Sequence, residues 1–312
     1  MKLAVVVPAY NEEKTVGKVI HQIPKRIPGI EKVEIIVVDD GSTDWTVSEA
    51  MKAGAKVIRH KMNMGLAISF RDGLDAALED GADVIVNTDA DLQYDQRDIP
   101  KLIKPIIKGE ADIVLTDRNV WKLPHMPLGK KIGNKLATWI VRILSGFPVK
   151  DAQSGFRAFS REAALNLNVL SGYTYVQETI IQAVFKKMKI TQVPCKFRAR
   201  EGDSRLIKSI WSYAKRAGLT ITTTYVHYKP LEIFLTAGIF LVLLGFVIGF
   251  RVLANFLLTG SVSPYIPSAI LTAILLIVGF QIVMLGLIAD SINANRRTME
   301  RILYLIRKNS KR

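Results

Sequence analysis

The sequence predicts an α/β domain built on a mostly parallel sheet, followed by an interfacial segment and two membrane-spanning helices. Strand-like and helix-like segments alternate along the first two-thirds of the 312 residues. Acidic clusters directly follow two of the strand-like runs, and two long stretches near the C-terminus are almost free of charge. Since domains run to roughly 100–200 residues, the chain has room for one sizeable domain and a membrane region.

Five short apolar runs are the expected strands. The first, residues 3–7, is uninterrupted and ends at Pro8, which is typical of a strand that is buried on both faces. The others cover residues 33–38, 56–59, 84–87 and 113–116. Strands that alternate with helices pair in parallel and need helices on both faces of the sheet.

Apolar residues at helical spacing fill the intervals between these strands. We expect helices over residues 12–23, 65–78 and 99–108, and a further helical run over 175–187. A helix also follows the second strand, and Ser42 or Thr43 is its expected N-cap because a hydroxyl can accept from a free backbone N–H. Ligands of such sheets bind beyond the carboxyl ends of the strands, so the residues there are the functional candidates.

Two uncharged stretches predict the membrane spans. Apart from Arg251, residues 233–289 include no charged side chain. A helix needs about 20 apolar residues to cross a hydrocarbon core about 30 Å thick. We therefore expect spans over residues 233–258 and 266–289, divided at 259–264. Small residues within both spans would let the helices pack closely, inside one chain or between the chains of a homo-oligomer: Gly245, Gly249, Gly279 and Gly286.

The charge distribution predicts the orientation in the membrane. The net charge is +15, and residues 290–312 carry seven Lys and Arg against two acidic residues. Positive flanks stay in the cytosol, so we expect a plasma or ER-type membrane protein with its catalytic domain and both termini cytoplasmic. Basic residues at this height attract anionic lipids. No groove-reading motif is visible, so nucleic acid is not an expected partner. The single Cys195 fits a reducing compartment.

Residues 206–228 combine apolar positions at helical spacing with lysines and arginines opposite them. Directly before a span, this pattern is typical of a helix in the membrane interface. The alternative is a surface helix that packs on the catalytic domain. The expected organisation is a catalytic domain over 1–205, amphipathic juxtamembrane helices over 206–230, two transmembrane helices over 231–290 and a basic cytoplasmic tail over 291–312.

The chemistry-bearing residues follow the fourth expected strand. Asp89 and Asp91 stand one residue apart, and Gln93 adds a neutral oxygen. Mg²⁺ typically takes one or two carboxylates and fills its other positions with phosphate oxygens and water, which suits a nucleoside diphosphate. A structural acidic turn is the alternative. The matching acidic strand end at Asp39 and Asp40 favours a site that binds Mg²⁺ or Mn²⁺.

The sequence resembles family 2 glycosyltransferases of the GT-A fold. The resemblance rests on VVVPAYNE at 5–12, VVDDGSTD at 37–44, NMG at 63–65 and DADLQ at 89–93, in the family's order and spacing. Three further segments resemble the dolichyl-phosphate mannose and glucose synthases and their undecaprenyl-phosphate relatives: DR at 117–118, DAQSGFR at 151–157 and REGDSR at 200–205. The resemblance covers about residues 3–230.

The resemblance implies which residues bind the donor. It assigns the base and ribose to Pro8, Tyr10, Glu12 and Asp39, with Asp40, Asn63, Gly65 and Ala90 in the same nucleotide-binding elements. It places Asp89 near the donor sugar and ribose, and gives the metal to Asp91 and Gln93. For Glu12, a carboxylate in the first turn of a helix is the alternative.

The acceptor side is implied in the same way. Arg118 and Arg200 match arginines that contact the lipid phosphate, and Arg200 joins Asp89 and Asp91 as an implied catalytic residue. Lys130 and Asn134 stand where relatives carry an arginine and a serine, a departure that weakens the phosphate role of that helix. Ser204 and Arg205 are expected to fix the loop that bears Arg200.

The implied reaction is an inverting transfer of a hexose from a GDP-mannose or UDP-glucose type donor to a polyprenyl (dolichyl) phosphate. A phosphate monoester, whose second pKa is about 6, is already largely anionic and needs no general base. One alternative is a processive polysaccharide synthase, but none of the four tryptophans stands in the Gln-x-x-Arg-Trp pattern of those enzymes. The other is a catalytically inactive scaffold that binds nucleotide sugar. The quoted segments are common to GDP-mannose and UDP-glucose enzymes.

Overall fold

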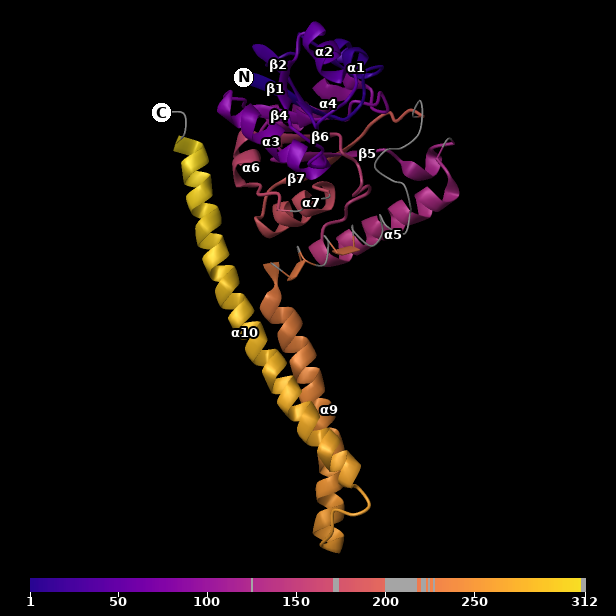
Figure 1. Cartoon of the computed structure of the whole chain (residues 1–312), viewed down its shortest axis with the longest axis vertical. Helices are drawn as coiled ribbons and strands as arrows, with labels where there is room; N and C mark the ends of the chain where they lie inside the picture. The colour runs from indigo at the N-terminus through magenta and orange to yellow at the C-terminus, as the bar shows by residue number, and fades with distance from the viewer. Residues whose placement is uncertain are drawn as a thin grey trace. The chain divides into compact units, whose positions relative to one another are not determined.

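The computed structural model describes residues 1–124, 126–170, 174–199, 218–219, 223, 225–226 and 228–309. The chain divides into two compact units. The α/β unit comprises Met1–Thr222 and Ile302–Arg312, and the hairpin unit comprises Thr223–Arg301. The strands all belong to the α/β unit (Figure 1).

A mixed seven-stranded sheet forms the centre of the α/β unit. Its order is β3-β2-β1-β4-β6-β5-β7. The strands are β1 (Lys2–Ala9), β2 (Lys32–Asp39), β3 (Lys56–Arg59), β4 (Val84–Asn87), β5 (Ile113–Asp117), β6 (Arg157–Ser160) and β7 (Ile190–Pro194). Pairing is parallel except at β6, which runs antiparallel to both β4 and β5. The predicted mostly parallel α/β fold is confirmed. The reversed β6 was not predicted, because a four-residue strand that begins with an arginine gives no clear apolar run.

Helices cover both faces of this sheet, as predicted. They are α1 (Val16–Gln22), α2 (Thr46–Lys52), α3 (Leu66–Glu79), α4 (Ile99–Ile107), α5 (Leu128–Ser145), α6 (Arg161–Asn166) and α7 (Val176–Phe185), with 3₁₀ turns η1 (Gln96–Asp98) and η2 (Val120–Lys122). The odd-numbered side chains of β1, such as Val5, share a core with α1 and α4. Val6 faces α3, where a Cβ on Gly73 would lie 2.3 Å from Val6 Cγ1. The α3 backbone therefore packs directly on the sheet.

The predicted cap of the helix after β2 is wrong. Helix α2 begins at Thr46, and the side chain of its N-cap residue, Trp45, makes no capping hydrogen bond. The Ser42 hydroxyl instead accepts from Asn11 N at 2.9 Å, across the edge of the sheet. Asp44 Oδ1 accepts from Thr46 N at 3.0 Å. The polar residues after β2 are thus used to join two loops, and the helix starts later.

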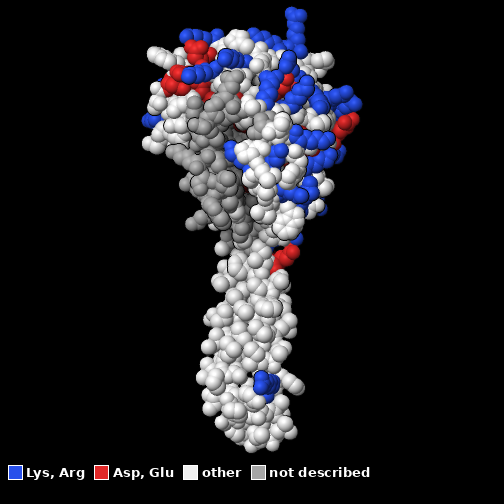
Figure 2. Space-filling view, turned by 90° about the vertical axis from the view of Figure 1, so that its right-hand side faces the viewer, with Lys and Arg blue, Asp and Glu red and all other residues white. Residues whose placement is uncertain are grey.

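Two long apolar helices make up the hairpin. Helix α9 (Pro230–Thr259) ends at Gly260, which adopts the left-handed conformation, and α10 (Ile266–Asn309) follows. Both are long and apolar enough to cross a membrane by length and composition. On the face drawn in Figure 2, the apolar part of the hairpin shows almost no charged side chains. The helices pack closely within one chain, because a Cβ on Gly279 would lie 2.9 Å from Gly238 O.

Helix α10 is longer than the expected second span. It continues through residues 290–309, most of which were expected to form a basic tail. Arg296 pairs with Glu300 one turn later at 2.8 Å, and neither glycine nor proline interrupts the segment. These features favour a continued helix. Most of the expected juxtamembrane helices at 206–230 lie outside the described residues.

Candidate active site

The carboxyl ends of β1, β2 and β4 lie side by side, because these strands are adjacent and parallel. Strand β5 points the same way as β4, since both run antiparallel to β6. The segments after all four strands therefore meet at one edge of the sheet. This edge gathers the predicted donor residues near β1, β2 and β4 and the predicted acceptor residue Arg118 after β5.

Side-chain hydrogen bonds lock the loops after β1 and β2 together. Asn11 Oδ1 accepts from Thr43 N at 2.9 Å, and Asn11 itself has φ of 54°. Glu12 N donates to Thr46 Oγ1 at 2.8 Å. Helix α1 begins only at Val16 and has no acidic residue in its first turn, so the alternative reading of Glu12 as a first-turn carboxylate is wrong. The lock fixes the backbone beside Tyr10 and Glu12.

Asp39 is a fully buried carboxylate at the end of β2. Both of its oxygens lie 3.3 Å from Ser42 N, and Arg59 Nε lies 3.3 Å from its Oδ2. The Arg59 side chain is 60% exposed, so it covers Asp39 from the solvent side. Its contribution was not predicted, although its position at the end of β3 brings it beside Asp39 in the sheet register.

Asp40 organises the loop that leads into α3. Its carboxylate accepts from Met64 N at 2.7 Å and Gly65 N at 2.9 Å, and lies 2.9 Å from His60 Nδ1. Gly65 has φ of 96°, a conformation that side chains disfavour. Asp40 is therefore engaged within the protein, and a direct contact with nucleotide remains a prediction for it. Asn63, in the same loop, is exposed.

Gly41, next along the chain, has a steric role in this arrangement. Its φ is 76°, and a Cβ there would lie 2.5 Å from the carbonyl carbon of Met62. The backbone before Asn63 thus packs directly on the loop after β2. No other residue type fits this position without moving one of the two loops.

Asp89 lies against the loop that precedes β6. A Cβ on Gly155 would lie 3.3 and 3.4 Å from the two Asp89 oxygens and 2.9 Å from Tyr175 Oη. Asn87 Nδ2 donates to Tyr175 Oη at 2.6 Å and to Gly155 O at 3.0 Å. The Tyr175 ring stacks on Phe70, with centroids 3.9 Å apart. Burial, and secondarily the Asp89 charge, hold the pKa of Tyr175 well above its ordinary value, so it remains a neutral donor.

Asp91 and Gln93 belong to a turn that contacts a segment far along the chain. Leu92 has φ of 62°, and Gln93 N donates to Asp91 Oδ1 at 3.2 Å. Arg198 N donates to Gln93 O at 2.8 Å, and Arg198 Nη2 donates to Asp95 Oδ2 at 2.7 Å. The turn is therefore bound on one side by residues 195–199. Neither Arg198 nor Asp95 was singled out from the sequence.

The oxygen ligands near Asp91 suit a divalent cation that also binds phosphate. Within the described part of the chain, no group of three or more His, Cys, Asp or Glu side chains could hold a metal alone. Two carboxylates, Asp89 and Asp91, follow one strand, with the Gln93 amide two residues further on. Mg²⁺ usually takes only one or two carboxylates and leaves its other positions to substrate and water. The residues present fit that kind of site.

On the acceptor side, Arg118 forms a buried ion pair with Asp151. Arg118 Nε lies 2.6 Å from Asp151 Oδ2, and Nη2 lies 2.9 Å from Oδ1. Asn134 Nδ2 donates to Asp151 Oδ1 at 3.1 Å, so Asp151 joins two of the predicted acceptor residues. The side chains of Arg118 and Asp151 are only 10% and 1% exposed. Phe197 lies under the Arg118 guanidinium at 5.0 Å.

This pair determines the charge states of both groups. Burial acts to raise the pKa of Asp151, but the Arg118 guanidinium outweighs it and the pKa is lowered. Burial likewise acts to lower the pKa of Arg118, and the Asp151 charge outweighs it and raises the pKa. Both groups are therefore ionised. Lys130 is exposed in the first turn of α5, whereas Arg200, Ser204 and Arg205 lie outside the described residues.

Arg157 is a functional candidate that sequence reasoning missed. It is fully buried and donates to Ser154 O, Ala152 O, Val176 O and Thr179 Oγ1, at 2.6 to 3.1 Å. Burial lowers its pKa to about 10. Its position at the end of the 151–157 segment, which carries part of the family resemblance, could have identified it from the sequence. Arg157 holds the loop that carries Asp151 and Gly155.

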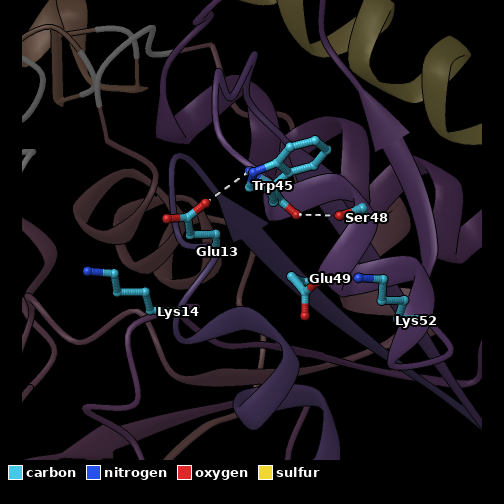
Figure 3. Close-up of a pocket in the computed structure, with 6 residues that line it drawn as sticks. All are labelled: Glu13, Lys14, Trp45, Ser48, Glu49 and Lys52. Atoms are coloured by element: carbon cyan, nitrogen blue, oxygen red, sulfur yellow. Dashed lines mark hydrogen bonds and ion pairs between the residues drawn. The ribbon is translucent and has the colours of Figure 1, made fainter.

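An open cavity of about 560 Å³ lies beside the donor loops (Figure 3). It is lined by Glu13, Lys14, Trp45, Ser48, Glu49 and Lys52. Glu13 Oε2 accepts from Trp45 N at 3.2 Å, which continues the contact between the two loops. The cavity contains none of the predicted site residues. Its mixed charges and wide opening indicate a solvated surface next to the site.

Known proteins resemble both the sequence and the fold. The model of the family described as "Glycosyl transferase family 2" matches residues 4–166, which is more than half of the chain. A UDP-N-acetylglucosamine–dolichyl-phosphate N-acetylglucosaminyltransferase of Methanococcus voltae is 37% identical over 217 residues, which cover 61% of this chain and 83% of the relative. A dolichol-phosphate mannosyltransferase of Pyrococcus furiosus is 34% identical, with 69% of this chain and 62% of the relative covered.

A solved structure shares the fold. Glucosyl-3-phosphoglycerate synthase of Mycobacterium tuberculosis, in complex with Mn²⁺, uridine-diphosphate-glucose and phosphoglyceric acid, superposes with a TM-score of 0.55 and 25% identity. The match covers 70% of this chain and 80% of that one. The aligned part therefore reaches beyond the family match.

Proposed function

Because the chain belongs to glycosyl transferase family 2, we propose that it transfers a hexose from a nucleoside diphosphate sugar to the phosphate of a dolichyl-type polyprenyl lipid, with inversion at the anomeric carbon. The two relatives named for dolichyl phosphate support the acceptor. The structural neighbour that binds uridine-diphosphate-glucose with Mn²⁺ supports the donor class.

The observation that carries this proposal is the meeting of two unlike sets of groups at one edge of the sheet. Carboxylates follow β1, β2 and β4, and the Arg118 guanidinium follows β5 at the same edge. A nucleoside diphosphate bridged to the carboxylates by a cation would bring its sugar toward the basic side. A phosphate acceptor needs such a basic side, because planar guanidinium groups suit phosphate oxygens.

Each donor residue has a role in this scheme. Tyr10 supplies an aromatic face to the base, while Glu12 and Asp39 accept from hydroxyl or N–H groups of the nucleoside. Asp91 and Gln93 would hold Mg²⁺ or Mn²⁺, which when bound stabilises the charge of the departing diphosphate. Asp89 orients the sugar, and the contact with Gly155 and Tyr175 keeps its carboxylate in place.

The acceptor requires positioning more than activation. A phosphate monoester is largely dianionic near neutral pH, so its oxygen attacks the anomeric carbon without a general base. The new bond forms from phosphate oxygen to carbon as the bond from carbon to the diphosphate breaks. Asp151 fixes the plane of the Arg118 guanidinium and positions the Asn134 amide. Correct placement of reactants supplies much of the rate in such reactions.

The membrane helices hold the catalytic machinery where its acceptor is found. A lipid phosphate lies at headgroup height, and drawing the lipid into water costs about 0.8 kcal/mol per exposed CH₂. Helices α9 and α10 are long and apolar enough to remove that cost. We infer that the α/β unit faces the cytosol, since basic flanks are retained there.

The donor is best identified by direct assay of the full chain in lipid nanodiscs. UDP-N-acetylglucosamine, UDP-glucose and GDP-mannose are each supplied with dolichyl phosphate, with Mg²⁺, with Mn²⁺ or with EDTA. We expect one donor to give a lipid-linked sugar with inverted configuration, dependent on the cation and on Asp91. Absence of product with every donor would favour a binding scaffold, and a growing polysaccharide would favour a processive synthase.

A further inference from the structure

His60 lies between two carboxylates, in the loop that follows β3. Its Nδ1 lies 2.9 Å from Asp40 Oδ1, and its Nε2 lies 3.2 Å from Asp72 Oδ2 on α3. The side chain is only 10% exposed, and His60 N donates to Asp39 O at 2.9 Å. The imidazole ring is therefore held from the end of β2 and from α3, with a carboxylate at each nitrogen.

Both carboxylates act as acceptors in this arrangement. Asp40 accepts from Met64 N on one oxygen and from Gly65 N on the other. Asp72 Oδ1 accepts from Arg71 Nε at 3.1 Å. An ionised carboxylate has no proton to donate, so each contact with the ring requires an N–H on the imidazole. Only an imidazolium, with a proton on both nitrogens, satisfies both contacts.

The basic residues on either side of the ring in sequence have other environments. Arg59 Nε lies 3.3 Å from Asp39 Oδ2, and Lys61 is exposed. Within the described part of the chain, Asp40 and Asp72 are the ionisable side chains that contact the ring. The positive charge of the ring is therefore what joins these two carboxylates.

We propose that protonated His60 is a positioning residue for the donor and that it makes nucleotide affinity depend on pH. Asp40 holds the backbone of the loop that carries Asn63 and leads into α3 at Gly65. The family resemblance assigns Asn63 and Gly65 to the nucleotide. The contacts from Asp72 through the ring to Asp40 fix this loop against α3. The role in donor binding rests on the proposed function.

Loss of the ring proton loosens these contacts. A neutral imidazole has one N–H and one bare nitrogen, so it donates to only one of the two carboxylates. The bare nitrogen then faces the other carboxylate oxygen, and their lone pairs repel each other. Histidine is the side chain whose charge ordinarily changes near neutral pH. A rise in pH therefore weakens the hold on the loop.

Nitrogen NMR of the histidine rings tests the charge state directly. The full chain is prepared in detergent with isotope-labelled histidine, and His60→Gln identifies the His60 signals. We expect both ring nitrogens of His60 to carry a proton at about pH 6 and one of them to lose it by about pH 8.5. One bare nitrogen already at about pH 6, or two protons still present at about pH 8.5, would overturn the proposal.

Calorimetry then measures the effect on the donor site. UDP and GDP are each titrated with Mn²⁺ into the full chain between about pH 6 and about pH 8.5. We expect the dissociation constant of the nucleotide to rise about tenfold over this range, the loss typical of one hydrogen bond to a charged group. His60→Gln should bind as weakly as the parent at high pH and lack this step. His21→Gln is the matched control and should keep the step, since His21 is exposed on α1.

Asp72→Asn provides a second variant that leaves the ring in place. It removes one negative charge beside the imidazolium, so the step in affinity should move to lower pH. A purely structural role of His60 predicts weaker binding or lower stability with no movement of the step. The same pH dependence in the parent and in Asp72→Asn would therefore overturn the proposal.

Transfer kinetics separate this proposal from the proposed function. In His60→Gln, KM for the donor should rise about tenfold with a smaller fall in kcat, because the loop is needed to bind the donor. A fall in kcat with an unchanged KM would overturn the proposal. A parent that binds nucleotide with the expected step but transfers no sugar would contradict only the proposed function. A fully active parent whose nucleotide affinity is the same at every pH would contradict only the role of His60.

Discussion

The donor and acceptor sides of the candidate site hold their charges in opposite ways. On the donor side, Asp40 is held by the backbone amides of Met64 and Gly65 and by His60. On the acceptor side, the Arg118 guanidinium is held by the Asp151 carboxylate in a buried ion pair. Backbone amides fix a carboxylate without cancelling its charge, whereas an ion pair brings the local charge close to zero.

This difference indicates which further charges each side requires to bind its substrate. Asp39 is paired with Arg59, but the other carboxylates after β1, β2 and β4 retain a negative field that suits a cation and its diphosphate. Arg118 can orient a phosphate through hydrogen bonds, but its pairing with Asp151 leaves little net positive charge. Further cationic side chains must therefore attract the phosphate. Lys130 is one candidate in the described part of the chain, and Arg200 is another by resemblance. The donor side thus keeps a net negative charge, whereas the acceptor side holds the Arg118 guanidinium in a fixed orientation with little net charge.

The largest expected effect comes from removing a donor-side charge. Asp91→Ala should lower kcat/KM by about 10⁴-fold, since the cation that neutralises the leaving diphosphate loses a ligand. Calorimetry should show weaker binding of Mn²⁺ with the nucleotide. Asp80→Asn is the matched control, because Asp80 is paired with Lys56 at the surface away from the site. An Asp91→Ala variant that binds Mn²⁺ and nucleotide like the parent would show that Asp91 does not hold the cation.

Breaking the acceptor-side ion pair should first affect stability. Arg118→Leu leaves a buried Asp151 charge uncompensated, which costs about 3–5 kcal/mol. The double variant Arg118→Leu with Asp151→Leu should recover most of that loss, because no unpaired charge remains. Thermal unfolding in detergent measures both effects.

Activity of the same double variant then sharpens the comparison. If Arg118 orients the acceptor, the refolded double variant stays inactive in transfer while its nucleotide binding is retained. Recovery of transfer along with stability would mean that the pair serves the fold alone.

Much of the donor side was predictable because its signals are local. Each short apolar run ends in polar residues, and parallel pairing brings those ends together, so Asp39 and Asp89 could be placed at one edge. The residues at 259–264, which divide two uncharged stretches, likewise predicted the break between α9 and α10. The reversed β6 was not predicted in this way, because Arg157 is a buried charge, and one of the carbonyl groups that accept from it, Val176 O, is 19 residues away.

The acceptor side depends on contacts that sequence spacing does not reveal. Asp151 reaches Arg118 over 33 residues, and Arg198 reaches Asp95 over 103 residues. The exposed face of α5, formed by Leu128, Ile132, Leu136, Trp139 and Ile143, is apolar at helical spacing, which usually indicates a face that packs in the core. Its exposure becomes evident only when Thr138, Val141 and Ser145 are seen to occupy the packed side.

A smaller effect is expected from adding one methyl group between the two sides. Gly155→Ala places a Cβ 2.9 Å from Tyr175 Oη and within 3.4 Å of both Asp89 oxygens. The Asp89 carboxylate must shift, so we expect about a 100-fold lower transfer rate with the fold retained, as small misplacements are costly in catalysis. Gly17→Ala is the control, since its nearest neighbour would be 3.8 Å away. Parent-like rates for Gly155→Ala would show that Asp89 is not positioned from this side.

The smallest effect concerns Asp95, which ties the Asp91 turn to residues 195–199. Hydrogen bonds from Arg97 lower the pKa of Asp95 from 3.8 to about 2. Since the folded pKa is below the unfolded one, this stabilisation is present above pH 3.8 and is lost as the pH falls toward 2. At pH 5, Asp95→Asn should therefore unfold at a lower temperature than the parent. We expect its free energy of unfolding to be lower by at most about 2 kcal/mol. The two proteins should converge near pH 2 in thermal unfolding scans, and a gap that stays constant with pH would assign the effect to packing and not to charge.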